Sequence, residues 1–264
     1  MNAINKASYS HVVKFRKIDD HFKDSIENKY IWFAAPETLN DPFDCRVDLR
    51  EAVRRADKSN PNNQHLTNFA NTYAPYKNAP YKIPHDVMIF SASMAEKNVH
   101  RSTLMWAHYG DCHKGVMIKY CTQSLLSGHL GLKFEKVQYC SNGITKWLAQ
   151  SVAGNTIQGS KLLSGWWQHM FLTKTSPWQY EREVRIIRSG WQLEETHGVL
   201  IPSDPKLTIP DNAIQEMYFG FNTPQRDIDC VINLVRESFP SSNCKFFKLC
   251  KSKKTDFGTT TKLL

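Results

Sequence analysis

Long apolar segments are missing from this 264-residue chain. No run of about 18 apolar residues occurs, so the sequence predicts no helix that spans a membrane. The first ten residues also lack the apolar stretch of a signal peptide. No two cysteines have the C-x-x-C spacing, and their odd total of seven favours free thiols over a disulfide framework. These absences predict a cytoplasmic protein without membrane contact.

Several sequence motifs of common enzyme classes are absent as well. The chain has no G-x-x-x-x-G-K, no G-x-G-x-x-G and no G-x-S-x-G, which disfavours a P-loop enzyme, a dinucleotide-binding fold and a hydrolase. His108, Cys112 and His113 lie close together, but they form no H-x-x-x-H pair and no third ligand is near. We therefore expect no metal ion.

Acidic residues are outnumbered by basic ones, 25 against 34, which gives a net charge of +9. Such a balance indicates a polyanionic partner such as RNA, or merely a basic surface. A compact basic cluster occurs only near the C-terminal end, at Lys245, Lys248, Lys251, Lys253 and Lys254. The hydrophobic content of 41% and the charged content of 22% are those of an ordinary globular protein.

The local patterns predict an α+β protein with more strands than a helical bundle and no regular βαβ rhythm. We expect one domain over residues 1–264, with a helical excursion at about 46–85 and a helical insertion at about 145–175. Helices are also expected at 20–28, 101–109 and 227–239. Strands are expected at 12–17, 30–34, 87–93, 115–120, 133–140, 183–188, 197–201, 214–219 and 244–249.

Residues 178–188 read W-Q-Y-E-R-E-V-R-I-I-R, and their second half is typical of a buried strand. Residues two apart in a strand point to the same face, so Glu181 and Glu183 are expected side by side, with Arg185 next. One interpretation is an ion-pair ladder with Arg182 and Arg185, which is common on strands. The other is a catalytic acid with a neighbour that orients the substrate.

A tight loop carries a second group of polar residues. Asn40, Asp41 and Pro42 form a strong turn signal, and Asp44 follows closely. These side chains need backbone donors, an arginine or a ligand as partners. The sequence alone leaves a self-capping turn and a ligand site equally open.

Three segments in order resemble a widespread bacterial family of unknown function: F-A-A-P-E-T-L-N-D-P-F-D (33–44), L-M-W-A-H-Y-G-D-C-H-K-G-V (104–116) and W-Q-Y-E-R-E-V-R-I-I (178–187). The layout also resembles ADP-ribosyltransferases, which have a basic residue on the first strand and an E-x-E motif on a later one. That resemblance implies a split mixed or antiparallel sheet core with peripheral helices. The chain departs from it at Ala34-Ala35, where many members have S-T-S.

The resemblance implies NAD as co-substrate and a role for each candidate residue. Glu183 would stabilise positive charge on the ribose, and Glu181 would orient the acceptor or accept its proton. Arg16 would bind the NAD phosphates. The other candidates for NAD binding are Phe15, Tyr30, Asn40, Asp41, Trp106 and Tyr109.

The profile is also similar to the CmdT-type toxins of toxin–antitoxin–chaperone phage-defence systems. This similarity implies an enzyme that modifies messenger RNA and blocks translation, held silent by an antitoxin and accompanied by a SecB-like chaperone. Three alternatives remain open. They are transfer to protein or water, a basic RNA-binding module without catalysis, and a metal-dependent nuclease that uses Asp41, Asp44 and Glu183.

Overall fold

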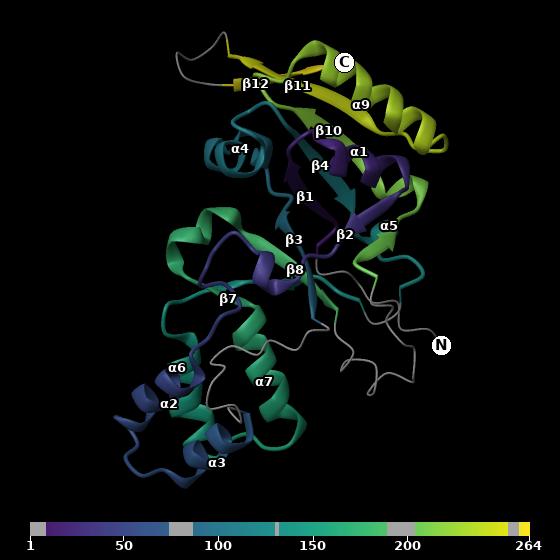
Figure 1. Cartoon of the computed structure of the whole chain (residues 1–264). Helices are drawn as coiled ribbons and strands as arrows, with labels where there is room; N and C mark the ends of the chain where they lie inside the picture. Colours follow the sequence, from purple (N-terminus) through teal and green to yellow (C-terminus); the bar gives the residue numbers. More distant parts are fainter. Residues whose placement is uncertain (1–8, 74–86, 130–131, 189–203, 253–258) are drawn as a thin grey trace.

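A large mixed sheet forms the centre of the computed structural model, which describes residues 9–73, 87–129, 132–188, 204–252 and 259–264 (Figure 1). Within these residues the sheet has eight strands in the order β12-β11-β10-β4-β1-β3-β8-β5. Among the described strands of this sheet, only β10 and β11 pair in parallel. The strands are β1 (His11–Arg16), β3 (Met88–Met94), β4 (Val116–Cys121), β5 (Glu135–Lys136), β8 (Glu183–Arg188), β10 (Ile214–Phe219), β11 (Lys245–Lys251) and β12 (Thr259–Leu263). The expected α+β class is confirmed.

The sheet is divided between β1 and β3. β1 pairs with β4 along its whole length, and β3 pairs with β8 over six residues. In contrast, β1 and β3 pair only through Val12 with Met94 and Val13 with Ser93. Beyond these two pairs the backbones of β1 and β3 are no longer paired, so two half-sheets meet at a short seam.

The larger half-sheet consists of β12, β11, β10, β4 and β1, and helices cover both of its faces. α1 (Asp20–Glu27) and α9 (Gln225–Ser238) pack together on one face (Figure 1). The side chain of Asp19 accepts a hydrogen bond from the Phe22 amide, 2.8 Å away, and so caps α1, a role for which aspartate is well suited. α4 (Thr103–Tyr109) contacts β1 on the other face, where Trp106 is buried in a separate core cluster.

The two helical stretches predicted from sequence meet in one helical lobe (Figure 1). Its members are α2 (Leu49–Asp57), α3 (Gln64–Tyr73), α6 (Gly143–Trp147), the π-helical turn η3 (Leu148–Val152) and α7 (Ser160–Phe171). They share a hydrophobic cluster that also includes Cys45 and Ile89, so the lobe packs onto both the N-D-P-F-D loop and β3.

Short elements connect these layers. β2 (Tyr30–Trp32) pairs with β9 (Lys206–Thr208), and β6 (Gln138–Tyr139) pairs with β7 (Thr173–Lys174). The remaining elements are η1 (Pro36–Thr38), η2 (Val99–Arg101), α5 (Thr122–Leu125), η4 (Ser176–Glu181) and η5 (Asp211–Ala213).

Some predicted strands differ from the observed ones. The strand expected at 133–140 is divided into β5 and β6, because Val137 donates to the Glu183 carbonyl and Gln138 to that of Leu172, so the chain changes partner. The strand at 244–249 was expected to be the last one in the sheet, but β12 follows it and pairs with β11. The threonine-rich sequence of β12 does not by itself indicate this pairing. The strand expected at 197–201 lies outside the described residues.

Candidate functional site

The two glutamates reach one site from different elements. Glu181 ends the 3₁₀-helix η4, and Glu183 begins β8 at the start of the predicted strand, so the two glutamates lie close together without sharing one strand. Arg182 lies between them with a φ of 47°, in the left-handed region that ordinary residues seldom adopt. Its carbonyl accepts a hydrogen bond from Met94, which holds this turn against β3.

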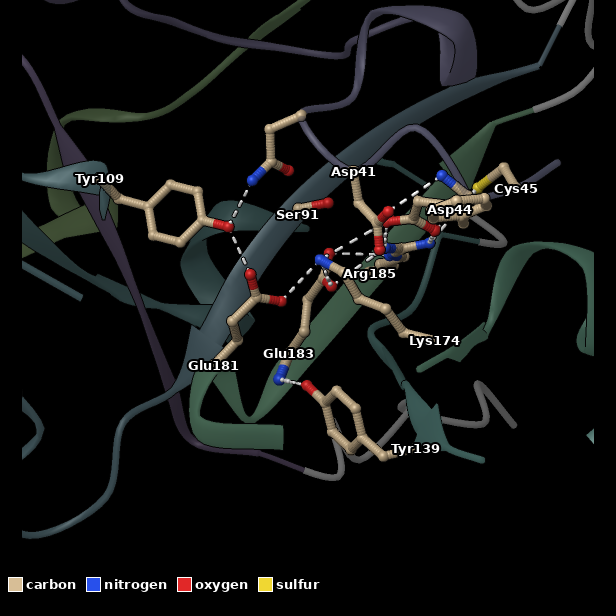
Figure 2. Close-up of polar contacts among 12 residues, drawn as sticks. Asp41, Asp44, Cys45, Ser91, Tyr109, Tyr139, Lys174, Glu181, Glu183 and Arg185 are labelled. Atoms are coloured by element: carbon tan, nitrogen blue, oxygen red, sulfur yellow. Dashed lines mark hydrogen bonds and ion pairs between the residues drawn. The ribbon is translucent and has the colours of Figure 1, made fainter. Parts of the chain in front are cut away.

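Arg185 is the centre of a buried charge network, which we define as Asp44, Lys174, Glu181, Glu183 and Arg185 (Figure 2). The Arg185 guanidinium is 2.7 Å (Nε) and 3.0 Å (Nη2) from the two Glu183 oxygens. It also donates to both Asp44 oxygens, at 2.9 and 2.5 Å. This bidentate pairing on both sides confirms Arg185 as a partner in the predicted ladder. Arg182 is not a partner, because it pairs with Glu96 near the surface.

Lys174 joins Glu181 to the rest of the network. Its ammonium lies 2.7 Å from Glu181 Oε2, and 3.4 and 3.5 Å from Glu183 and Asp44. The other Glu181 oxygen accepts a hydrogen bond from the Tyr109 hydroxyl, which in turn accepts one from the Asn40 amide at 2.8 Å. The N-D-P-F-D loop, α4 and η4 are thereby tied together around one carboxyl group (Figure 2).

The pKa values of the two glutamates shift in opposite directions. Burial alone would raise the pKa of Glu183, but Arg185 and then Lys174 outweigh it, and the pKa falls to about 2. Burial and the nearby Glu183 charge raise the pKa of Glu181, against the opposing effects of Lys174 and Tyr109. The network holds three carboxylates and two cations, so the network as a whole becomes neutral when Glu181 carries one proton. Glu183 therefore stays ionised, and Glu181 is the group suited to exchange a proton.

A hollow of about 210 Å³, the first hollow, opens beside this network. Glu181, Glu183 and Lys174 line it together with Tyr109 and Asn40. Phe15 also contributes to its wall and packs edge-on against Trp106, with ring centroids 5.0 Å apart. The candidates Phe15, Asn40, Tyr109, Glu181 and Glu183 are thus brought together around one space.

A second hollow, of about 540 Å³, adjoins the first. Arg16 and Tyr30 line it, with the additional side chains of His21, Trp32 and Lys206. The Tyr30 hydroxyl donates to Asp24, and burial together with this bond raises the pKa of Tyr30 to about 12. Trp32 is 46% exposed, which leaves a large aromatic surface free at the mouth.

The two hollows share the wall residues Lys14, Leu39 and Ser91. Parts of the expected strands at 12–17, 30–34 and 183–188 meet here, although they lie far apart in the sequence. Residues of β1, β2 and β8 do line these adjoining hollows, and Arg16 and Glu183 are not on opposite sides of the molecule.

Two further candidates line neither hollow. Trp106 is fully buried in the core, where its indole N–H donates to the His100 carbonyl at 2.7 Å. Asp41 is also buried, and one of its oxygens accepts a bond from the Phe43 amide, 2.9 Å away. That bond is the self-capping turn allowed by the sequence, and it supplies Asp41 with a structural role.

Sequence reasoning missed Lys174 and Lys14, which both line the site. Neither belongs to a recognisable motif. The only local signal at Lys14 is a charged side chain inside an apolar strand, V-V-K-F-R, where a buried cation is costly without a partner. Lys174 carries the same signal only weakly, because it ends the two-residue strand β7 and polar residues follow it.

The nuclease alternative requires a cation site, and the described residues contain no group of three or more His, Cys, Asp or Glu side chains that forms one. The oxygens of Asp44 and Glu183 are taken by Arg185 and Lys174. A divalent cation would have to displace these internal cations to bind.

No helix in the described part of the chain is long and apolar enough to cross a membrane. No curated protein and no solved structure matches the chain. A family model described as "Protein of unknown function (DUF2971)" matches residues 105–186, which run from α4 to β8. This stretch contains the M-W-x-H-Y and W-x-Y-E-x-E-x-R motifs, so over these residues the chain is similar to a family to which no activity is assigned.

Proposed function

We propose that this protein is an NAD-dependent ADP-ribosyltransferase that modifies RNA. The observation that carries the proposal is the pair Glu181 and Glu183, which line one hollow with pKa values shifted in opposite directions. When the pKa values of two carboxyl groups are separated in this way, one group can supply a permanent charge while the other takes up and releases a proton. Glycosidic bond cleavage requires both roles.

In this proposal NAD spans the two hollows. The nicotinamide and its ribose occupy the first hollow, beside Glu183 and Tyr109. The diphosphate and the adenosine extend into the second hollow, where Arg16 supplies a cation and Tyr30 and Trp32 supply aromatic surfaces.

The reaction breaks the bond between the ribose C1′ and the nicotinamide nitrogen, and nicotinamide leaves with the bonding electrons. The ionised Glu183 stabilises the positive charge that develops on the ribose. A nucleophilic oxygen or nitrogen of the acceptor then bonds to C1′ and loses its proton to Glu181. The products are nicotinamide, the ADP-ribosylated acceptor and one proton.

The divided sheet supports the same proposal, since the resemblance to ADP-ribosyltransferases implies a split sheet core. The missing hydroxyls at Ala34-Ala35 have a substitute in Ser91 of β3. Ser91 lines both hollows, and its hydroxyl is buried without a hydrogen-bond partner among the described residues. We assign the ribose contact that Ala34 cannot make to Ser91.

RNA is the proposed acceptor because the protein carries a net charge of +9 and exposes aromatic side chains. Phe43 is 75% exposed in the N-D-P-F-D loop, one residue from Asp44 of the first hollow. Unpaired bases stack on such aromatic surfaces. The proposal extends to messenger RNA, to inhibition of translation in phage defence, and to an antitoxin and a SecB-like chaperone as partners in the cell.

One observation favours a second candidate, a basic RNA-binding module without catalysis. Glu183 is only 5% exposed and both its oxygens are paired, as a purely structural ion pair would be. In that case the hollows would bind ligand but cleave nothing.

The proposal is tested by incubating the protein with labelled NAD and cell extract, followed by separate RNase and protease treatment. We expect a labelled product that RNase destroys and protease leaves intact, in the presence of EDTA. Label removed by protease alone would move the acceptor to protein. RNA degradation that requires divalent metal, without any label, would replace the transferase by a nuclease.

A further inference from the structure

Lys14 lies across the division in the sheet. It follows Val13, the last residue of β1 that pairs with β3. Its ammonium reaches over to β3, where it donates to the Ser91 carbonyl at 2.5 Å and lies 4.7 Å from the centre of the Phe90 ring. Because Lys14 and Ser91 line both hollows, this single side-chain contact forms part of the wall that separates them.

Within the part of the chain that the structure describes, Lys14 and Arg16 are cations without a carboxylate partner. They point to the same face of β1, being two residues apart, and both line the second hollow. Among the described residues neither forms a salt bridge. The only carboxylate in the wall of this hollow, Asp24, accepts a bond from Tyr30 and lies 3.6 Å from Lys206.

The surroundings make an unpaired lysine costly at this place. Burial and the neighbouring Arg16 lower the pKa of Lys14 to about 7, and the charge of Glu183 offsets this only in part. A carbonyl and a ring face stabilise an ammonium less than an anion does. A bound anion would therefore complete the coordination of Lys14 and hold it protonated.

We propose that Lys14 and Arg16 form a diphosphate-binding site at the division of the sheet, and that Lys14 exchanges the Ser91 carbonyl for a phosphate oxygen when a nucleotide binds. This movement removes the contact between the hollows and joins them. The inference rests on the proposed function only for the identity of the nucleotide, NAD. The anion site itself follows from two adjacent unpaired cations in a hollow with aromatic walls.

The site is tested by calorimetric titration with ADP-ribose, a diphosphate that cannot lose nicotinamide, and with adenosine as the uncharged comparison. Lys14→Met keeps the apolar stem against Phe90 and removes the charge. Lys17→Met is the matched control, because Lys17 is exposed just beyond β1 and lines neither hollow. Lys14→Gln is a second variant whose amide still donates to Ser91, in case the methionine variant folds poorly.

We expect ADP-ribose to bind the Lys14 variants roughly 10- to 100-fold more weakly than the wild type, as the loss of one charge-assisted hydrogen bond implies. Lys17→Met should bind normally, and melting temperatures should not fall. Equal affinity of Lys14→Met and wild type, or wild-type affinity no higher for ADP-ribose than for adenosine, would overturn the inference. Lys14-dependent binding without cleavage of NAD would leave the diphosphate site intact and remove the transferase assignment.

Discussion

The two hollows share a wall, yet their charged side chains are partnered in opposite ways. In the first hollow the three carboxylates and Lys174 pair with one another or with Arg185. In the second hollow Arg16 has no salt bridge among the described residues, and Lys14 contacts only a carbonyl and a ring. The first arrangement is complete without a ligand, whereas in the second hollow Lys14 and Arg16 have no anionic partner among the described residues.

This difference separates structural charges from binding charges. Removing one partner of a buried pair leaves the other uncompensated, so residues of the charge network should matter for stability. Removing a cation that has no salt-bridge partner leaves no uncompensated charge, so substitution of Arg16 or Lys14 should affect ligand binding and not stability. Glu181 belongs to both groups, because it is paired within the network and its raised pKa also makes it the glutamate there that can carry a proton.

The largest effect is expected for Arg185→Met. The substitution leaves Asp44 and Glu183 buried with only Lys174 nearby, and should lower the free energy of unfolding by about 3–5 kcal/mol. Arg16→Met is the matched change in the second hollow and should alter stability by less than about 0.5 kcal/mol. Urea denaturation of both variants measures the contrast. Equal losses would remove the distinction between the hollows.

A smaller loss of stability is expected for Glu183→Gln. The amide keeps the size of the side chain but gives up two charge-assisted bonds with Arg185, and we expect a loss of about 2–3 kcal/mol. Glu181→Gln should cost clearly less, since the carboxyl group there already has a raised pKa. Both variants make the same chemical change, so their thermal melts show which glutamate contributes more to stability. The reverse order would contradict the assignment of Glu183 to the charge network.

Acid should weaken the wild type in a defined pH window. The pKa of Glu183 falls from 4.5 to about 2 on folding, so its stabilisation is complete above pH 4.5 and disappears as the pH drops towards 2. The change amounts to at most about 3 kcal/mol. Glu181 acts in the opposite sense, because a raised pKa costs stability as the pH rises through it. Unfolding measured between pH 2 and 6 should show the acid loss in the wild type and much less of it in Glu183→Gln.

The smallest effect concerns the basic end of the sheet. Lys251 is exposed at the end of β11, whereas Lys248 is partly buried and donates to the Thr223 carbonyl. If this edge contacts RNA, Lys251→Glu should weaken binding about tenfold or less and reduce the slope against salt by roughly 1. Lys58→Glu in the helical lobe makes the same charge change and should bind as the wild type does. Salt titrations that do not distinguish the two variants would exclude this edge as a contact.

Local sequence patterns predicted much of the fold. The helices at 20–28 and 227–239 and the buried strand at 183–188 depend on neighbouring residues, and they formed close to the expected positions. The ladder partner Arg185 was also predictable, because it is two residues from Glu183. Asp44 was not, since it reaches Arg185 across 141 positions of the chain.

The rest of the site depends on long-range packing. The left-handed backbone at Arg182 places Glu181 outside the strand, and the sequence E-R-E does not predict this turn. Lys14 becomes important only because β1 and β3 separate beside it, a property of the whole sheet. Trp106 shows the reverse case, where a residue within a motif turned out to be core.

The most direct test of the account is the release of nicotinamide from NAD by the purified protein, measured by chromatography for the wild type and Glu181→Gln. An acceptor RNA must be present, because Glu181 is assigned to the acceptor's proton. We predict release by the wild type and a loss on the order of 10²- to 10³-fold in Glu181→Gln, with melting temperatures close to each other. A folded wild type that releases no nicotinamide with any RNA, or a Glu181→Gln variant as active as the wild type, would contradict the central claim.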